Sequence, residues 1–270
     1  MDILSAVILG LTEGVMGFLP LSSSGHIVLV NEILPLAEVN NIAISAIFYL
    51  TSALAVIIYF WSDIWVLLQT LMRKMGRLPV NEKDLVLLYA LLAGAIPALV
   101  FGLILGSVID KYLSSVIVVA VTMMLSALFF MYVEWKYYLS PPQGEITVNK
   151  GLKIGLFQLL SIIPGFSRLG MTMAGGMLLG LSRYESARFS FLLSIPIVLG
   201  FGIKKLLDLI VNGGEVIWLP VIISSIISLT LSLIVIHVFL LFVRRYTLWP
   251  FIWYSFILSA LTFYYLLFVR

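Results

Sequence analysis

The stretch Pro20-Leu21-Ser22-Ser23-Ser24-Gly25-His26 is a short polar loop between two apolar runs, and Pro164-Gly165-Phe166-Ser167-Arg168-Leu169-Gly170 is a second such loop later in the chain. Together with the nearby Glu13, they place a carboxylate, hydroxyls, an imidazole and a guanidinium inside sequence that is otherwise typical of lipid-embedded protein. Polar backbone at membrane depth is tolerated only where protein or a water-filled cavity satisfies it. Charged groups there point to function. The two loops therefore predict a membrane-embedded site for an anionic, phosphate-bearing molecule.

The composition is that of an integral membrane protein. Of the 270 residues, 62% are hydrophobic and only 11% are charged, whereas soluble domains carry about 25% charged residues. Apolar runs of roughly 20 residues match a hydrocarbon core of about 30 Å, and a membrane β-barrel would instead show alternating segments of about 10 residues. We predict an all-α polytopic fold. The chain has no cysteine, so it holds no disulfide and no thiolate ligand or nucleophile.

Six stretches are long enough to cross the membrane, and they cover residues 42–61, 85–109, 113–133, 185–207, 216–243 and 249–269. Regions 1–35 and 151–182 are also apolar, but the two polar loops cut each of them into halves of about 10–15 residues, too short to cross singly. We predict that each of these regions is a re-entrant helix–loop–helix.

This arrangement divides the chain into two similar halves within a single membrane domain, residues 1–270. Residues 1–134 hold one re-entrant pair and three spans, and residues 151–270 repeat the pattern. The connection from Glu134 to Lys150 contains Ser140-Pro141-Pro142-Gln143-Gly144-Glu145, the clearest loop in the chain. Three spans per half give the halves opposite orientations, which predicts inverted repeats that meet near the midplane.

The distribution of lysine and arginine predicts the orientation. The basic residues divide into two groups, one on each side of the membrane. The smaller group contains Lys111, Arg270, Lys204 and Lys205, and the larger group is expected on the cytoplasmic side. The cavity is therefore predicted to open to the extracytoplasmic side of the plasma membrane. The larger group comprises Arg73, Lys74, Arg77, Lys83, Lys136, Lys150, Lys153, Arg183, Arg244 and Arg245.

The first loop offers several groups that could do chemistry. Glu13 lies inside an apolar element, where it is an acid, a base or a metal ligand, or else a carboxylate that caps the next loop or pairs with Arg168. Serines before an apolar run cap helices, and the free N–H groups of a helix start can seat an anion. His26 titrates near neutral pH and lies among hydroxyls, which favours a functional role. We expect Ser22, Ser24 and Gly25 to line the phosphate seat.

The second loop is centred on Arg168. Its planar guanidinium suits bidentate phosphate contacts, and pairing with Glu13 alone is the structural alternative. Ser167 and Thr172 would add hydroxyl donors. Gly170 allows close backbone approach to a phosphate, although tight helix packing explains such glycines equally well.

These residues resemble the two signatures of the undecaprenyl-diphosphate phosphatase family, which is linked to bacitracin resistance. The resemblance covers essentially the whole chain, in its length and order of spans as well as its motifs. It is carried by the Glu13 to His26 segment, the Pro164 to Gly170 segment, Gly175-Gly176-Met177-Leu178, Gly180, Ser182-Arg183-Tyr184 and Phe189-Ser190-Phe191-Leu192-Leu193.

The resemblance implies an enzyme that removes the terminal phosphate of a polyprenyl diphosphate and returns the monophosphate carrier used in cell-envelope glycan synthesis. Family members typically need Mg²⁺ or Ca²⁺. By motif position, Glu13 corresponds to the first residue of a paired-glutamate motif and would hold the metal ion. Ser23 and His26 correspond to the catalytic serine and histidine. The phosphate-binding group of the family corresponds to Ser167, Arg168 and Thr172.

The chain departs from the family pattern at two positions. The second glutamate of the pair is Gly17 here, and the serine that usually follows the motif arginine is Leu169. Two carboxylates at i and i+4 would share a helical face and could hold one cation together. With Glu13 alone, substrate phosphates and water must complete the shell. The chain is then either a divergent active enzyme or a relative whose hydrolysis is weak or lost.

We therefore expect a membrane-embedded polyprenyl-diphosphate hydrolase that acts on an undecaprenyl or a dolichol-type carrier. The alternative is a polyprenyl-phosphate binding protein or flippase on the same fold, which would bind the head group without releasing phosphate. An ion-coupled transporter would use Glu13 and His26 as a proton relay, but it leaves Arg168 unexplained. The expected partners are the lipid substrate and membrane lipids, and glycine-rich helix faces permit a homodimer. We expect no nucleic acid partner, because the basic residues lie in short loops.

Overall fold

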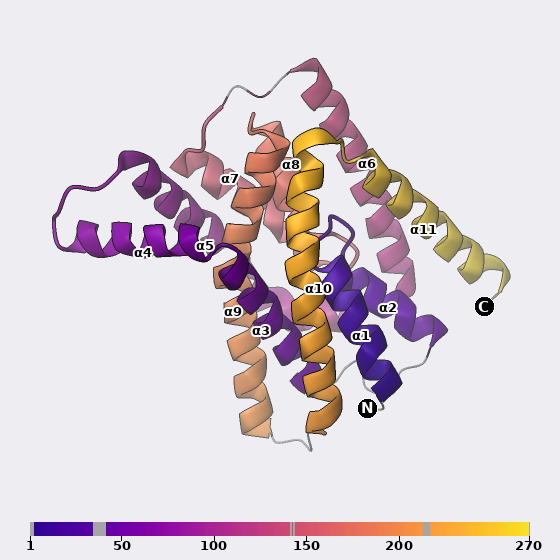
Figure 1. Cartoon of the computed structure of the whole chain (residues 1–270). Helices are drawn as coiled ribbons and strands as arrows, with labels where there is room; N and C mark the ends of the chain where they lie inside the picture. The colour runs from indigo at the N-terminus through magenta and orange to yellow at the C-terminus, as the bar shows by residue number, and fades with distance from the viewer. Residues whose placement is uncertain (1–2, 35–41, 141, 143, 213–216, 270) are drawn as a thin grey trace.

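The computed structural model describes residues 3–34, 42–140, 142, 144–212 and 217–269, and every regular element in these ranges is helical. The predicted all-α fold is confirmed (Figure 1). The elements are α1 (Ile3–Met16), α2 (Ser23–Ile33), α3 (Ile42–Tyr59), α4 (Trp61–Met75), α5 (Glu82–Tyr112), α6 (Val116–Leu139), α7 (Val148–Gln158), the 3₁₀ turn η1 (Leu159–Ile162), α8 (Arg168–Leu178), α9 (Arg183–Asn212), α10 (Trp218–Arg245) and α11 (Trp249–Phe268).

Five helices are long and apolar enough to cross a membrane, and they confirm five of the six predicted spans. They are Glu82–Gly106, Val116–Leu139, Arg183–Val211, Trp218–Val243 and Trp249–Phe268. The sixth prediction, residues 42–61, corresponds to α3. This helix meets the same criteria only together with α4, from which it is bent by 84°.

The prediction of a short loop between the spans 42–61 and 85–109 is wrong, because this segment contains helix α4. In Figure 1 this helix projects sideways from the bundle, and its exposed residues include Trp61 and Trp65. Arg73 and Lys74 lie in its last turn. A helix with an apolar face, tryptophans and terminal basic residues is typical of the membrane interface. This helix was not predicted, because the predicted spans were identified by uniformly apolar runs.

The helices beside the polar loops are short. Helix α1 has 14 residues, and α2, α7 and α8 have 11 each, which at about 1.5 Å per residue gives roughly 17–21 Å. None of them alone crosses a hydrocarbon core of about 30 Å. The Gly144 N–H donates to the carbonyl oxygen of Gly180 at 3.1 Å. The α7–α8 segment therefore begins and ends at the same end of the bundle, as a re-entrant pair must. The inverted repeat itself stays a prediction.

Helix α8 lies in the protein core. It packs against α6, α7 and α9, and its residues from Leu169 to Met177 are all buried. The surrounding core includes the fully buried rings of Phe130, Phe191 and Phe239 from three other helices. Because close-packed interiors hold side chains in fixed positions, the residues at the start of α8 sit on a rigid support.

Helix α1 is held against α10 by close backbone approach. A Cβ atom added at Gly14 would lie 2.9 Å from the Ser228 carbonyl oxygen and 2.9 Å from Leu231 Cβ. Glycines at such contacts let two membrane helices pack closely. This packing fixes the position of α1 and of the carboxylate that it carries one residue earlier.

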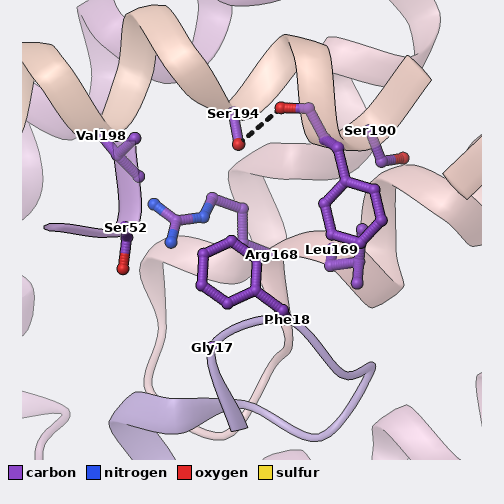
Figure 2. A pocket seen from close by; sticks show the side chains of 9 residues that line it. Gly17, Phe18, Ser52, Arg168, Leu169, Ser190, Ser194 and Val198 are labelled. Carbon is purple, nitrogen blue, oxygen red and sulfur yellow. Dashed lines mark hydrogen bonds between the residues drawn. The ribbon is translucent and has the colours of Figure 1, made fainter. Parts of the chain in front are cut away.

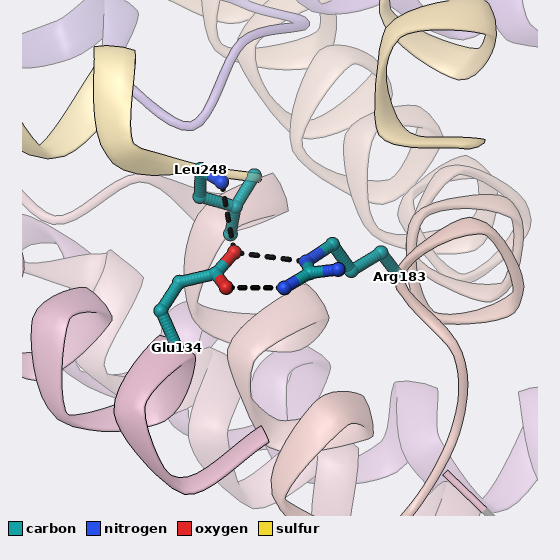
Figure 3. A network of polar contacts seen from close by, with 3 residues as sticks. All are labelled: Glu134, Arg183 and Leu248. Carbon is teal, nitrogen blue, oxygen red and sulfur yellow. Dashed lines mark hydrogen bonds and ion pairs between the residues drawn. The ribbon is translucent and has the colours of Figure 1, made fainter. Parts of the chain in front are cut away.

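A second buried carboxylate corrects the predicted boundary at Glu134. Helix α6 continues to Leu139 instead of ending there, and the Glu134 side chain is 3% exposed. Figure 3 shows why: Arg183 donates to Glu134 through Nε at 2.9 Å and through Nη2, and the Leu248 N–H donates to it at 2.8 Å. The network joins α6, α9 and the start of α11.

Parts of several predictions lie outside the described residues. They are Pro141 and Gln143 of the connecting loop, the ends of the predicted segments at residues 1–2, 35, 216 and 270, and the Lys111 side chain and Arg270 of the charge pattern.

Candidate functional site

The two polar loops are in direct contact. The Ser22 hydroxyl oxygen accepts a hydrogen bond from the Gly165 N–H at 3.2 Å. The Ser167 hydroxyl donates to the Leu19 carbonyl oxygen at 3.2 Å. Residues that lie more than 140 positions apart in the sequence thus form one junction, as the paired motifs predict.

Ser22 is the centre of this junction. It caps α2, and its hydroxyl oxygen also accepts from the Gly25 N–H at 3.3 Å. Its backbone has a φ of 65°, a left-handed conformation that costs a non-glycine residue about 1–2 kcal/mol. The side chain is buried. Its oxygen is therefore engaged by two backbone donors, and the predicted contact of Ser22 with phosphate stays a prediction.

The second loop is fixed to α6 by Gly165 and Pro164. Gly165 has a φ of 97°, and a Cβ atom there would overlap the Thr122 hydroxyl. Thr122 donates to the Pro164 carbonyl oxygen at 2.7 Å. Only glycine satisfies both the positive φ and the close approach. These contacts therefore hold the second loop in one conformation up to the start of α8.

Glu13 is buried beside hydroxyl groups. Its side chain is 7% exposed, and the Ser52 hydroxyl of α3 donates to its Oε1 at 3.2 Å. Ser23 also faces this carboxylate closely enough to interact with it. A Cβ atom added at Gly17 would lie 3.2 Å from Glu13 Oε1 and 2.6 Å from the Glu13 carbonyl oxygen, so a side chain there requires the backbone to shift. A second carboxylate at position 17 would thus share the surroundings of the first.

Arg168 faces Glu13 without a direct ion pair. Within the described residues no salt bridge joins the two, although their charges interact. Figure 2 shows the guanidinium extending toward Ser52 and Val198 in a small cavity between the loops and α9. The cavity is lined by Gly17, Phe18, Ser52, Arg168, Leu169, Ser190, Phe191, Ser194 and Val198. The guanidinium therefore lines the cavity without forming an ion pair with Glu13.

His26 is held at both ring nitrogens. Nδ1 lies 2.8 Å from the Ser22 carbonyl oxygen and Nε2 lies 2.8 Å from the Tyr254 hydroxyl. A carbonyl oxygen only accepts, so Nδ1 carries the hydrogen. Neither nitrogen contacts Glu13. The Ser22 carbonyl oxygen therefore orients the imidazole ring.

The remaining predicted residues are placed as follows. Ser167 caps α8 by accepting from the Gly170 N–H at 3.1 Å. Thr172 donates to the Arg168 carbonyl oxygen at 2.9 Å, so its hydroxyl hydrogen is engaged within α8. Ser24 is exposed. Added Cβ atoms at Gly25 and Gly170 would press against Gly165 and Phe130, so both glycines serve close packing here.

Two helices begin at this junction. Helix α2 starts at Ser23 and α8 starts at Arg168, directly after the loops that contact each other. A helix start carries unpaired N–H groups and a partial positive charge, which together favour anions. Two such starts, one of which carries the Arg168 guanidinium, form a site suited to a phosphate-bearing head group.

A resident metal ion does not fit the protein side chains alone. Among the described residues, no group of three or more histidine, aspartate or glutamate side chains could hold a metal ion. Glu13 with its neighbouring serine hydroxyls supplies one charged ligand. Mg²⁺ often keeps one or two carboxylates and completes its shell with substrate phosphates and water, so this donor set fits a cation that the substrate brings.

Sequence reasoning missed four residues of the site. Ser52 and the pair Ser190 and Ser194 lie within apolar helices, where isolated serines more often bond to their own helix. The sequence does not show that these serines face the loops, because this depends on how α3 and α9 pack. Tyr254 was hidden among the aromatic residues near the end of the last span, a pattern typical of interfacial anchors.

The chain is similar to known proteins over nearly its whole length. A family model described as bacitracin resistance protein BacA matches residues 6–261. A protein of Teredinibacter turnerae named undecaprenyl-diphosphatase is 34% identical, over 97% of this chain and 99% of its own. Proteins of the same name from Saccharophagus degradans and Fusobacterium nucleatum are 36% and 35% identical, over 96% and 94% of this chain and 97% of each of their own. The chain therefore belongs to the BacA family of bacitracin resistance proteins.

Proposed function

We propose that the protein hydrolyses undecaprenyl diphosphate to the monophosphate carrier and inorganic phosphate. The observation that carries this proposal is the junction of the two loops, from which α2 and α8 begin and at which Arg168 lines a cavity. The names of relatives that match over nearly the whole chain support the same reaction. An apolar lipid tail would remain in the bilayer while the charged head group enters the junction.

The diphosphate would be bound by Arg168 and by the N–H groups at the helix starts. A guanidinium contacts two phosphate oxygens at once, and fixed donors stabilise the charge that develops on a transferring phosphoryl group. The cavity already holds these donors in place, because α8 is buried along its length.

Ser23 is the nucleophile in this scheme. It lies at the first position of α2 and faces the Glu13 carboxylate, which can accept its proton as the Ser23 oxygen attacks the terminal phosphorus. The bond to the bridging oxygen breaks, the polyprenyl monophosphate leaves, and a phosphoserine remains. Water then cleaves the phosphoserine and gives up its proton to His26 as general base.

A divalent cation is part of the proposal as a companion of the substrate. Glu13 would hold it together with the phosphate oxygens, and when bound it would neutralise phosphate charge. EDTA should then abolish phosphate release, and added Mg²⁺ or Ca²⁺ should restore it. Release that persists in EDTA would remove the cation from the scheme.

The cavity is proposed to open to the extracytoplasmic side. The basic residues Arg183, Arg244 and Arg245 cluster where α9 begins and α10 ends, an excess that marks the cytoplasmic side. Helix α1 begins at the opposite end of the bundle in Figure 1. The cysteine-free chain permits single cysteines at Ser24 and Ser140, and a membrane-impermeant thiol reagent on intact cells should label only the first.

The test of the reaction is phosphate release from undecaprenyl diphosphate by the detergent-purified protein. We expect release by the native chain and its loss in His26→Ala and Ser23→Ala. Turnover that is unchanged in His26→Ala would contradict the scheme.

The flippase alternative is favoured by one observation, the absence of two polar groups at Gly17 and Leu169 in a cavity that both residues line. A flippase moves labelled lipid across proteoliposome membranes without releasing phosphate. Lipid movement without phosphate release from the native chain would establish it, and phosphate release would exclude a purely non-hydrolytic role.

A further inference from the structure

Among the described residues, Tyr254 is the one hydrogen-bond partner of the His26 ring that comes from outside the two loops. It lies on α11, 228 residues from His26, and its hydroxyl is 2.8 Å from His26 Nε2. The two rings also stack, with centroids 5.6 Å apart and an angle of 19° between their planes. A hydrogen bond and a stacked ring together fix both the direction and the plane of the imidazole.

The hydrogen-bond pattern defines the form of His26. Because Nδ1 donates to the Ser22 carbonyl oxygen, the lone pair of the neutral ring is on Nε2. The Tyr254 hydroxyl therefore donates to Nε2. The basic nitrogen therefore contacts Tyr254 of α11, while the Glu13 carboxylate accepts from Ser52.

We propose that Tyr254 is a positioning residue for His26, which holds the imidazole in the Nδ1–H form and directs proton uptake to Nε2. This inference rests on the proposed function, in which His26 receives a proton from water. That proton reaches the Tyr254 oxygen while the tyrosine proton passes to Nε2, so Tyr254 stays neutral and His26 becomes an imidazolium.

The variant Tyr254→Phe removes the hydroxyl and keeps the stacked ring. The matched control is Tyr264→Phe, which removes a hydroxyl from the same helix at a ring that packs on Phe268. We expect Tyr254→Phe to lower kcat about tenfold, the effect of one well-placed hydrogen bond, with KM unchanged. Tyr264→Phe should match the native protein. Equal kcat in the two variants would overturn the proposal.

A spectroscopic measurement tests the contact without activity. The chain has two histidines, so ¹⁵N-histidine labelling gives two rings, and His237→Gln assigns them. We expect the native protein to show His26 as the Nδ1–H tautomer, and Tyr254→Phe to shift its Nε2 resonance while His237 stays unchanged. An unshifted His26 resonance would overturn the proposal. If the native chain released no phosphate, the proposed function would fail, while this measurement would still decide whether Tyr254 positions His26.

Discussion

The substitution Ser22→Ala tests how much the junction of the two loops contributes to the stability of the fold. The Ser22 oxygen accepts from the N–H groups of Gly25 and Gly165, and alanine leaves both donors without their partner. A buried donor that loses its acceptor costs about 1–3 kcal/mol. Two donors give an expected loss of about 2–4 kcal/mol in the free energy of unfolding, toward the low end of the sum because water can reach part of the site.

The backbone of Ser22 provides an internal check on this reasoning. At a φ of 65°, glycine avoids the left-handed penalty of about 1–2 kcal/mol that alanine retains. Ser22→Gly should therefore be less destabilising than Ser22→Ala by about 1 kcal/mol. The exposed Ser62 of α4 is the control, and Ser62→Ala should change the free energy of unfolding by less than about 1 kcal/mol.

Thermal unfolding in detergent is the assay, with phosphate release measured on the same samples. At about 2–4 °C per kcal/mol for a chain of this size, the Tm of Ser22→Ala should fall by roughly 4–16 °C. Its activity should fall as well, because the starts of α2 and α8 separate. Equal Tm values for Ser22→Ala and Ser62→Ala would refute the account of the junction.

Three further substitutions follow from the site and its support. Gly17→Glu should lower the Mg²⁺ concentration for half-maximal phosphate release by about tenfold, since a second charged ligand beside Glu13 contributes about 1.5 kcal/mol; Gly17→Ala is the control, and an unchanged requirement counts against a cation at Glu13. Leu169→Ser should lower KM about fivefold through one new donor worth ~1 kcal/mol, while the loss of a buried leucine lowers the free energy of unfolding by about 2 kcal/mol; an unchanged KM would place position 169 outside the phosphate contact. Arg183→Ala leaves the Glu134 carboxylate buried without its partner and should destabilise the protein by about 3–5 kcal/mol in thermal unfolding, with kcat per folded molecule retained; native-like stability would contradict the network.

Much of the fold could be predicted because lipid imposes one requirement on every span. Uniformly apolar runs of the right length identified five spanning helices, and Pro-x-x-Ser in apolar sequence identified the short paired helices. Helix α4 was not predicted because its 15 residues mix apolar and polar side chains. Such a mixture is typical of the membrane interface rather than of a spanning helix. The end of α6 was not predicted, because a glutamate after an apolar run is typical of a loop. Only the fold shows that Arg183 pairs with Glu134.

The candidate site was predictable where chemistry is unusual for its surroundings. A guanidinium and a carboxylate in apolar sequence are costly, so Arg168 and Glu13 stood out. The roles of the serines were less visible, because a hydroxyl that caps a helix and one that binds phosphate occur in the same sequence pattern. Tyr254 could not be found at all without the fold, since its contact with His26 spans 228 residues.

The central claim is that Arg168 from the second loop works in one site with the first. The most direct measurement is the rate of phosphate release from undecaprenyl diphosphate by the native protein, by Arg168→Ala and by the control Arg73→Ala, an exposed arginine of α4. The account predicts release by the native protein, a loss of about 10²–10³-fold in Arg168→Ala, and a native rate in Arg73→Ala. Arg168→Ala at the native rate would contradict it.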